Sequence, residues 1–316
     1  MRGFLLFVFL MGNVAAQDVY PSKNVRLIAA AAPGGNPDVL ARMLAAKLGD
    51  AFGKPFIVEN IPGAGGVVAA EQVARAAADG HTLMLGDSGA MAINVALNPK
   101  LSYNPLKDFA LITALAAVPT VLVVHPGVPA RSLQEFVNAA KTKQLAYGSA
   151  GNGSVHHLTM AVFLSRAGID SMLHVPYKGG TALVAGLLGG EVQAGWSGIP
   201  NVASHIKSGK LRVLCISTAR RSASLPDVPT AVELGFAGFD IATVIGLQAP
   251  AGLPREIAAR LQAAAAKALR EPDVAERMGN LGMELRENGT EHYARFVRED
   301  LERYVNAVRT AGVKHE

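Results

Sequence analysis

The sequence predicts an α/β protein built from two doubly wound lobes, in which helices cover both faces of a sheet. Three observations predict this fold class. The chain has 316 residues, which is too long for one ordinary core and enough for two lobes. Short apolar runs of strand length alternate with amphipathic segments of helix length, as in parallel sheets covered by helices. Glycine-rich turns directly follow several of the predicted strands.

The first residues have the pattern of a secretory signal peptide. Arg2 supplies a positive charge, residues 4–11 form an apolar run, and Val14-Ala-Ala16 is a small-residue cleavage pattern. This apolar run is too short to span a bilayer. We therefore predict an exported protein whose signal peptide, residues 1–16, is cleaved after about Ala16.

The first strand–helix unit shows how the elements are recognised. Residues 25–30 form an apolar run that predicts a buried strand. Asn36, Pro37 and Asp38 then predict the start of a helix, because Asn caps helices, Pro is favoured in their first turn, and an acid interacts well with their positive end. Apolar residues continue at helical spacing until Gly53, which is expected to end the helix.

The same patterns predict the remaining elements in chain order. Strands are predicted at residues 56–59, 82–86, 109–116, 120–124, 145–148, 173–175, 192–196 and 213–217. A helix is predicted at residues 67–77, and a capping box at residues 132–135 begins another. From residue 254 onward only helices are predicted, at residues 254–269, 272–281 and 290–311.

No repeat of fixed period and no low-complexity linker separates the lobes. We therefore predict that a pair of crossing strands joins them. Lobe 1 is expected to comprise residues 19–122 plus 242–316, and lobe 2 residues 123–241.

Charge and cysteine content narrow the possible functions. The 30 Lys and Arg outnumber the 25 Asp and Glu, for a formal net charge of +5, and the basic residues are scattered. A nucleic-acid interface needs clustered basic residues, so no nucleic-acid partner is predicted. A mildly positive field favours anionic ligands. The single cysteine, Cys215, excludes an internal disulfide and is expected to be a buried, inert thiol.

The histidines do not indicate a metal site. His156 and His157 are adjacent, so on a helix their side chains would point about 100° apart and would not readily bind one ion. We interpret them as helix-surface or capping residues. No metal and no cofactor are predicted.

Four glycine-containing segments follow predicted strands, at residues 32–38, 86–89, 149–154 and 196–200. In open α/β sheets, ligands bind beyond the carboxyl ends of the strands. Glycines there let the backbone approach a ligand, and the following helix N-termini offer unpaired N–H groups that can bind an anion without Arg or Lys. One such segment alone is readily explained as a tight turn, but the four together predict a binding site.

Two enzyme motifs are matched only in part. Gly86-Asp-Ser-Gly89 resembles the nucleophile segment of serine proteases, but Ala90 stands where a further glycine is expected. Residues 62–66 resemble half of a dinucleotide-binding fingerprint, with Val68 in place of its third glycine. We predict a binding protein and no enzyme. The alternatives are a ligand-sensing module and a secreted serine hydrolase that uses Ser88.

Motifs along nearly the whole chain resemble those of the substrate-binding receptors of tripartite tricarboxylate transporters, also called Bug proteins. The matching segments include Pro33-Gly-Gly35, Pro62-Gly-Ala-Gly-Gly66, Tyr147-Gly-Ser-Ala-Gly-Asn-Gly-Ser154, His174-Val-Pro-Tyr-Lys-Gly-Gly180, Leu225-Pro-Asp-Val-Pro-Thr230 and Gly246-Leu-Gln-Ala-Pro-Ala-Gly252. Their order and spacing make the resemblance specific.

The resemblance implies a periplasmic solute-binding protein of the type II fold, which closes on a small carboxylate or amino-acid ligand. It implies membrane permease subunits, or else a sensor protein, as partners, and a monomer is expected. Carried over by position, the ligand-binding residues would be Pro33, Gly34, Gly35, Asp87, Ser88, Ser149, Ala150, Gly151, Asn152, Gly153, Ser154, Trp196 and Ser197.

Three positions depart from the family pattern. Ala31 stands where an aromatic residue is usual, Asp87 where threonine is common, and Trp196-Ser-Gly198 where Phe-Asp-Asn is common. A carboxylate at Asp87 would repel a second ligand carboxylate by about 1 kcal/mol or more in a partly desolvated cleft. We therefore expect a mono-acid, an amino acid or a polar neutral end group rather than citrate.

Overall fold

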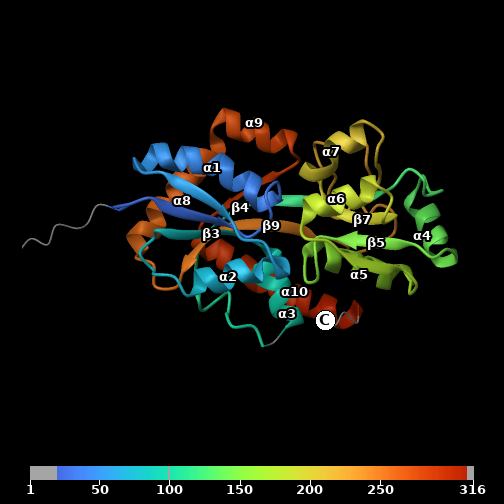
Figure 1. Cartoon of the computed structure of the whole chain (residues 1–316), viewed down its shortest axis with the longest axis horizontal. Helices are drawn as coiled ribbons and strands as arrows, with labels where there is room; N and C mark the ends of the chain where they lie inside the picture. Colours follow the sequence, from blue (N-terminus) through green and yellow to red (C-terminus); the bar gives the residue numbers. More distant parts are fainter. Residues whose placement is uncertain (1–19, 99, 312–316) are drawn as a thin grey trace, which may run out of the picture.

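The computed structural model describes residues 20–98 and 100–311, so the predicted signal peptide lies outside the described residues. Strands and helices follow the predicted order closely (Figure 1). The strands are β1 (Val25–Ala29), β2 (Phe56–Asn60), β3 (Thr82–Asp87), β4 (Phe109–Val124), β5 (Ala146–Ser149), β6 (Leu173–Pro176), β7 (Ala194–Gly198), β8 (Arg212–Ile216), β9 (Ala242–Pro250) and β10 (Glu284–Asn288). The helices are α1 (Asn36–Phe52), η1 (Ala64–Gly66), α2 (Val67–Ala74), η2 (Gly89–Ile93), α3 (Asn94–Leu97), α4 (Leu133–Thr142), α5 (Val155–Ala167), α6 (Gly180–Leu188), α7 (Ile199–Lys207), α8 (Arg255–Arg270), α9 (Pro272–Asn280) and α10 (Thr290–Ala311).

Local signals fix several helix ends where the sequence predicts them. α1 begins one residue earlier than predicted, because its N-cap is Gly35 and the Asn36 side chain makes no capping hydrogen bond with the described residues. Pro37 lies in the first turn of α1, and Gly53 ends that helix in the left-handed region at φ 68°. At the start of α4 the Ser132 hydroxyl accepts the Glu135 N–H at 3.2 Å, as expected of a capping box.

The strands form a ten-stranded, mixed sheet with the order β2-β1-β3-β9-β4-β7-β5-β6, and β8 and β10 also pair with β4. β1 is parallel to β2 and β3, and β5 is parallel to β6 and β7. The middle strands β4 and β9 are antiparallel to their neighbours. The prediction of parallel sheets is therefore correct for the outer strands and wrong for the middle ones.

β4 is the first strand to cross from one half of the molecule to the other. Up to Pro119 it pairs with β9, and from Thr120 it pairs with β7 and β8. The chain returns where Ile241 donates to the Ser217 carbonyl at 2.9 Å and β9 begins opposite Pro119. The predicted lobe boundaries at residues 122 and 242 lie close to these crossings and stay a prediction.

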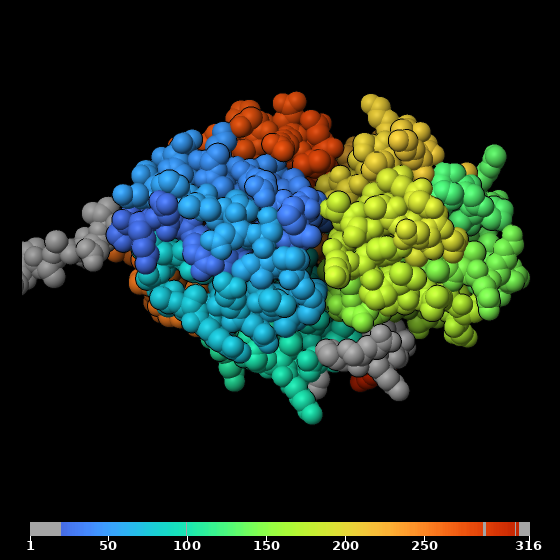
Figure 2. All heavy atoms as spheres, in the orientation of Figure 1, coloured from blue at the N-terminus to red at the C-terminus, as the bar shows by residue number. Residues whose placement is uncertain are grey.

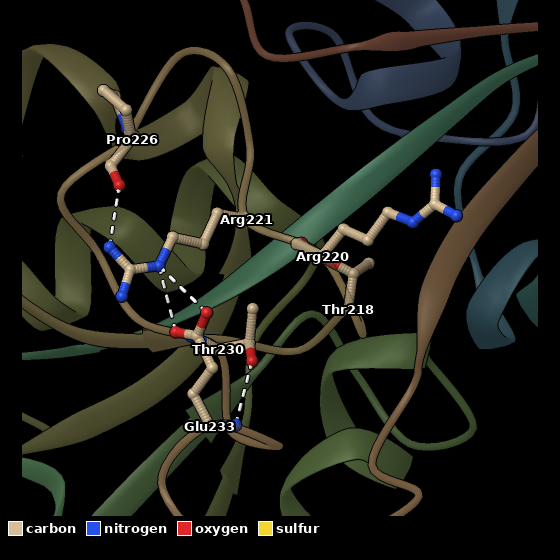
Figure 3. A network of polar contacts seen from close by, with 6 residues as sticks. All are labelled: Thr218, Arg220, Arg221, Pro226, Thr230 and Glu233. Atoms are coloured by element: carbon tan, nitrogen blue, oxygen red, sulfur yellow. Dashed lines mark hydrogen bonds and ion pairs between the residues drawn. The ribbon is translucent and has the colours of Figure 1, made fainter.

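A polar network organises the loop that leads back to β9 (Figure 3). Arg221 Nε donates to both carboxylate oxygens of Glu233, at 3.1 and 2.9 Å, and its Nη1 donates to the Pro226 carbonyl at 3.0 Å. The Thr230 N–H donates to the Glu233 carboxylate, and the Glu233 N–H donates to the Thr230 hydroxyl. The network gives this loop a fixed path without regular secondary structure.

Helices cover both faces of each half, as a doubly wound fold requires. In the first half, α1, α8 and α9 pack on one face and α2 with the beginning of α10 on the other. In the second half, α6 and α7 pack on one face and α4 and α5 on the other. In Figure 1, α6 and α7 lie above β7 and α5 lies below it.

The last helix, α10, runs beneath both halves (Figure 1). Tyr293 and Val297 belong to a core cluster of the first half, whereas Tyr304 is buried in a core cluster of the second half with Phe163 and Trp196. The C-terminal segment is therefore shared between the halves. No helix of the described residues is long and apolar enough to cross a membrane.

The structure corrects three further expectations about the elements. The two strands predicted at residues 109–116 and 120–124 are one continuous strand, β4. β9 is a strand that the sequence patterns did not predict. The segment after residue 254 is not only helical, because β10 pairs antiparallel with β4.

Candidate ligand-binding site

A cavity of about 870 Å³ lies between the two halves of the molecule. Its lining comes from the turns at the carboxyl ends of β1, β2, β3, β5 and β6 and from the helix N-termini that follow. Figure 2 shows the surface of α5 and α6 (yellow-green) in contact with that of the N-terminal segment from β1 to η2 (blue to cyan). The cavity thus occupies the place where ligands bind in open α/β sheets, and its volume suits a small molecule.

Three helices present N-termini to this cavity without a side-chain cap from any described residue. Their N-cap residues are Gly35 for α1, Gly66 for α2 and Gly179 for α6, and all three line the cavity. The first N–H groups of a helix have no partner within the helix, and they carry a partial positive charge. The arrangement is suited to binding a carboxylate through the backbone.

Several buried polar atoms of the lining have no hydrogen-bond partner among the described residues. They are Asn36 Oδ1, Thr243 Oγ1 and both ring nitrogens of His156. Asn36 is 6% exposed and Thr243 2%. Buried polar atoms are nearly always paired with protein, water or ligand. These atoms therefore mark hydrogen-bonding capacity in the cavity wall that the described residues leave unused.

Asp87 lies at the end of β3 and lines the cavity. Its Oδ1 accepts the Gly89 N–H at 2.9 Å. Burial raises the pKa of the Asp87 carboxyl to about 6, although the backbone N–H groups of Gly89 and Ala90 oppose that shift. In the described part of the chain no Lys, Arg or His forms an ion pair with it.

An aromatic stack forms one wall. Tyr147 lies against His174, with ring centroids 4.9 Å apart, and His174 lies against His157 at 4.1 Å, with nearly parallel rings. Ser149 Oγ is 2.7 Å from His174 Nε2 and so orients that ring. Burial lowers the pKa of His174 and of His156 to about 4, which leaves both rings uncharged at neutral pH.

Sequence reasoning missed these histidines as site residues. We predicted that His156 and His157 are helix-surface or capping residues, but both line the cavity. The signal was present, because His156 comes two residues after the N-cap Ser154 and the pair lies in the first turn of α5. That turn stands at the carboxyl end of β5, where ligands bind.

Two contacts join the halves beside the cavity. The Asn94 amide Nδ2 donates to the Gly89 carbonyl at 2.8 Å, to Gly153 in the other half at 3.1 Å, and more weakly to Gly65 at 3.3 Å. The Thr181 hydroxyl, at the start of α6, donates to the Pro33 carbonyl at 3.3 Å. The halves are therefore closed on each other.

The structure brings together only part of the predicted site. Seven of the predicted residues line the cavity, namely Gly35, Asp87, Ala150, Gly151, Asn152, Gly153 and Ser154. Pro33, Gly34, Ser88, Ser149, Trp196 and Ser197 do not line it. Pro33 and Gly34 instead lie against Thr181 at the contact between the halves.

Trp196 and Ser197 are fully buried. The Trp196 ring packs against Phe163 and Phe239 in the core of the second half, because its side chain points to the face of β7 that α5 covers. Gly198 instead provides a close approach: a Cβ at this position would stand 2.5 Å from Nδ2 of Asn36.

Ser88 is also buried, at 2% exposure. Its hydroxyl accepts the Val244 N–H at 3.2 Å and lies next to Asp300 and Tyr304 of α10. No histidine is among its contacts in the described residues. This geometry does not favour Ser88 as a nucleophile.

Comparison with known proteins identifies relatives over nearly the whole chain. The family model described as "Tripartite tricarboxylate transporter family receptor" matches residues 40–313. Protein BugT of Bordetella pertussis is 34% identical over 314 residues, which cover 98% of this chain and 96% of BugT.

Solved structures agree in fold. A protein of R. palustris solved with adipate is 30% identical and has a TM-score of 0.89, covering 93% of this chain and 99% of that one. MatC from Rhodopseudomonas palustris, solved with bound malate, is 34% identical and has a TM-score of 0.87, with coverage of 92% and 100%.

Proposed function

Because the chain belongs to the tripartite tricarboxylate transporter receptor family, we propose that it is a periplasmic receptor that captures a small carboxylate between its two lobes. The observation that carries the proposal is the cavity between the halves, onto which three uncapped helix N-termini open. Adipate and malate, the ligands of two structural relatives, are small carboxylates.

Ligand capture works through an equilibrium between open and closed lobes. The contacts of Asn94 with Gly153 and of Thr181 with Pro33 form only when the halves approach each other. A ligand that touches both halves binds the closed state better and shifts the equilibrium toward it. The closed form is the one that a membrane partner recognises.

The partner is a set of permease subunits that take up the released ligand. The test is uptake of the labelled ligand by cells with and without the gene for this chain. Loss of uptake on deletion supports delivery to a permease. Unchanged uptake by cells whose transcription responds to the ligand through this protein would assign it to sensing instead.

Export depends on the signal peptide, which is cleaved after about Ala16. N-terminal sequencing of the protein from the periplasmic fraction is expected to begin at Gln17. An uncleaved chain, or one retained in the cytoplasm, would contradict this part of the proposal.

Ligand binding is tested by thermal unfolding and calorimetry of the mature protein with a panel of small carboxylic acids, each paired with its neutral amide. A ligand that binds only the folded state at 100 times its dissociation constant stabilises by about 2.7 kcal/mol, so the melting temperature should rise by several degrees for the acid and not for the amide. The acid should be recovered unchanged. Failure of every carboxylate to bind, or its chemical conversion, would contradict the proposal.

A further inference from the structure

Asp87 places an uncompensated negative charge in the cavity. The carboxylate ends β3, lines the cavity, and accepts hydrogen bonds from backbone N–H groups of the turn that follows. A buried carboxylate without a cationic partner is unfavourable unless a partner is supplied. In the described part of the chain, the protein itself supplies none.

Two of the lining histidines and the one lining lysine offer Asp87 no counter-ion. His156 and His174 are uncharged at neutral pH because burial lowers the pKa of each to about 4. Lys178 is the one Lys or Arg side chain among the described lining residues. It is exposed and makes no ion pair with Asp87. A cationic group of the ligand would supply the partner that these side chains do not give Asp87.

The surroundings of Asp87 are rich in hydrogen-bond acceptors. A Cβ placed on Gly89 would stand 2.8 Å from both Asp87 Oδ1 and the Gly65 carbonyl oxygen, so both oxygens border Gly89. β9 runs antiparallel to β3 with Ile245 opposite Asp87, which places Thr243 just beyond the end of β3. Thr243 lines the cavity, and its buried hydroxyl has no partner among the described residues.

The opposite polarity is found at the N-termini of α1 and α6, which open onto the same cavity without side-chain caps. Backbone N–H groups there suit a carboxylate, whereas the oxygens around Asp87 suit a group with several N–H donors and a positive charge. One ligand that satisfies both regions carries a carboxylate and a protonated amine.

We propose that the ligand is a zwitterionic amino-carboxylate whose ammonium group donates to Asp87 and Thr243 and whose carboxylate meets the helix N-termini. The proposal rests on the function proposed above, and it makes Asp87 the residue that determines specificity. A plain dicarboxylate would place a second negative charge against Asp87 and is disfavoured.

The experiment is calorimetric titration of the mature protein with matched ligand sets. One set is 5-aminopentanoate, pentanoate and adipate, and the other is the common α-amino acids with their deaminated counterparts. The best amino-carboxylate is expected to bind at least tenfold more tightly than its counterpart with hydrogen or carboxylate in place of the amine. A dicarboxylate or plain mono-acid that binds best would overturn the inference and leave the proposed function standing, whereas no binding by any carboxylate would contradict both.

The variant Asp87→Asn removes the charge and keeps the shape. It is expected to weaken binding of the amino-carboxylate at least tenfold, and to leave or improve binding of the counterpart without the amine. Asp50→Asn is the matched control, because Asp50 is exposed near the far end of α1 and does not line the cavity. Equal affinity of the wild type and Asp87→Asn for the amino-carboxylate would overturn the assignment.

A second variant guards against misfolding of the first. Thr243→Val removes a hydroxyl that has no partner in the described protein and nearly preserves its volume, so the ligand-free melting temperature should change little. Its affinity for the amino-carboxylate is expected to fall severalfold, with a smaller change for the counterpart without the amine. If both ligands lose affinity equally, Thr243 does not face the ammonium group and that contact is refuted.

Discussion

Among single residues, Asp87 combines a cost in stability with a role in ligand selection. Its pKa of about 6 in the folded protein lies above the ordinary 3.8 because the carboxyl is buried. Between these pH values the native state binds more protons than the unfolded state, so stability decreases as the pH rises. Below about pH 4 the ionisation of Asp87 costs no stability, and above pH 6 it lowers the free energy of unfolding by about 3 kcal/mol.

Asp87→Asn should therefore stabilise the ligand-free protein at neutral pH. We expect a free energy of unfolding about 1–3 kcal/mol higher than wild type at pH 7.5, and no gain at pH 4. Urea unfolding at both pH values measures the difference. Burial also raises the pKa of Asp300 to about 6. Asp300 is present in both proteins, so its effect on stability cancels in the difference between them. A variant that is equally destabilised at both pH values would show that the carboxylate has a partner in the protein.

Gly153 allows the closest approach between the halves. It lies at φ 71°, and a Cβ on it would stand 2.1 Å from Asn94 Oδ1. Gly209 has the same φ of 71° but has nothing within 4 Å of such a Cβ. Alanine variants at the two positions therefore share the cost of backbone strain, and only the variant at Gly153 should also affect closure.

Gly153→Ala and Gly209→Ala should each cost about 1 kcal/mol of stability, because alanine is strained at positive φ. Only Gly153→Ala should also lower ligand affinity, by tenfold or more, because its methyl group keeps the halves from closing. Calorimetry and chemical unfolding of both variants test this. Equal affinities in the two variants would show that closure does not need this contact.

Among the elements, the junction of η2 and α3 acts as the clasp between the halves. Asn94 stands at this junction, 5% exposed, with its amide shared among carbonyls of η1, η2 and the β5–α5 turn. Two of these carbonyls lie in the first half and one in the second. Ile93 and Leu97 of the same element are buried in the core cluster of the second half, so the element contacts both halves.

Asn94→Ala is expected to lower ligand affinity at least tenfold and stability by about 1–3 kcal/mol, because buried carbonyls lose their donor. Asn94→Asp should bind still more weakly, since its carboxylate would face carbonyl oxygens. Asn138→Ala, on the exposed face of α4, is the control and should match wild type. A higher calorimetric affinity for Asn94→Asp than for Asn94→Ala would argue against the clasp.

At the scale of the whole molecule, α10 joins the halves in addition to the two crossing strands. Its first turns pack in the first half through Tyr293, and Tyr304 is buried in the second half. Trp196, the one tryptophan of the chain, lies in the same core cluster as Tyr304 and reports on that half. The two halves should therefore unfold as one cooperative unit.

Tyr304→Ala is expected to lower the free energy of unfolding by about 3–5 kcal/mol through the cavity it leaves. Val305→Ala, at 47% exposure on the same helix, should change it by less than about 0.5 kcal/mol. Urea unfolding followed by Trp196 emission and by circular dichroism should show one coincident transition that moves in the Tyr304→Ala protein. A shift seen only by Trp196 emission would show that α10 does not couple the halves.

The sequence alone predicts most of the elements and part of the site. The β1–α1 unit follows from an apolar run, Pro37 and Gly53, all of which act within a few residues of the chain. The glycine turns after β3 and β5 predict Asp87 and residues 150–154 in the lining, because the carboxyl ends of neighbouring strands meet at one edge. Near-continuous motifs also identify the family.

The tertiary structure decides what depends on residues far apart in the chain. β10 is a polar segment that becomes a strand only because β4 lies beside it, and the antiparallel β4–β9 pair joins residues more than a hundred positions apart. Trp196 goes to the core and His156 to the cavity according to which helix covers which face of the sheet. Strand pairing and cavity shape arise from contacts between distant segments, whereas capping and periodicity are local. The sequence by itself therefore determined most of the elements and the family, and only the folded chain decided which of the predicted residues line the cavity with Asp87.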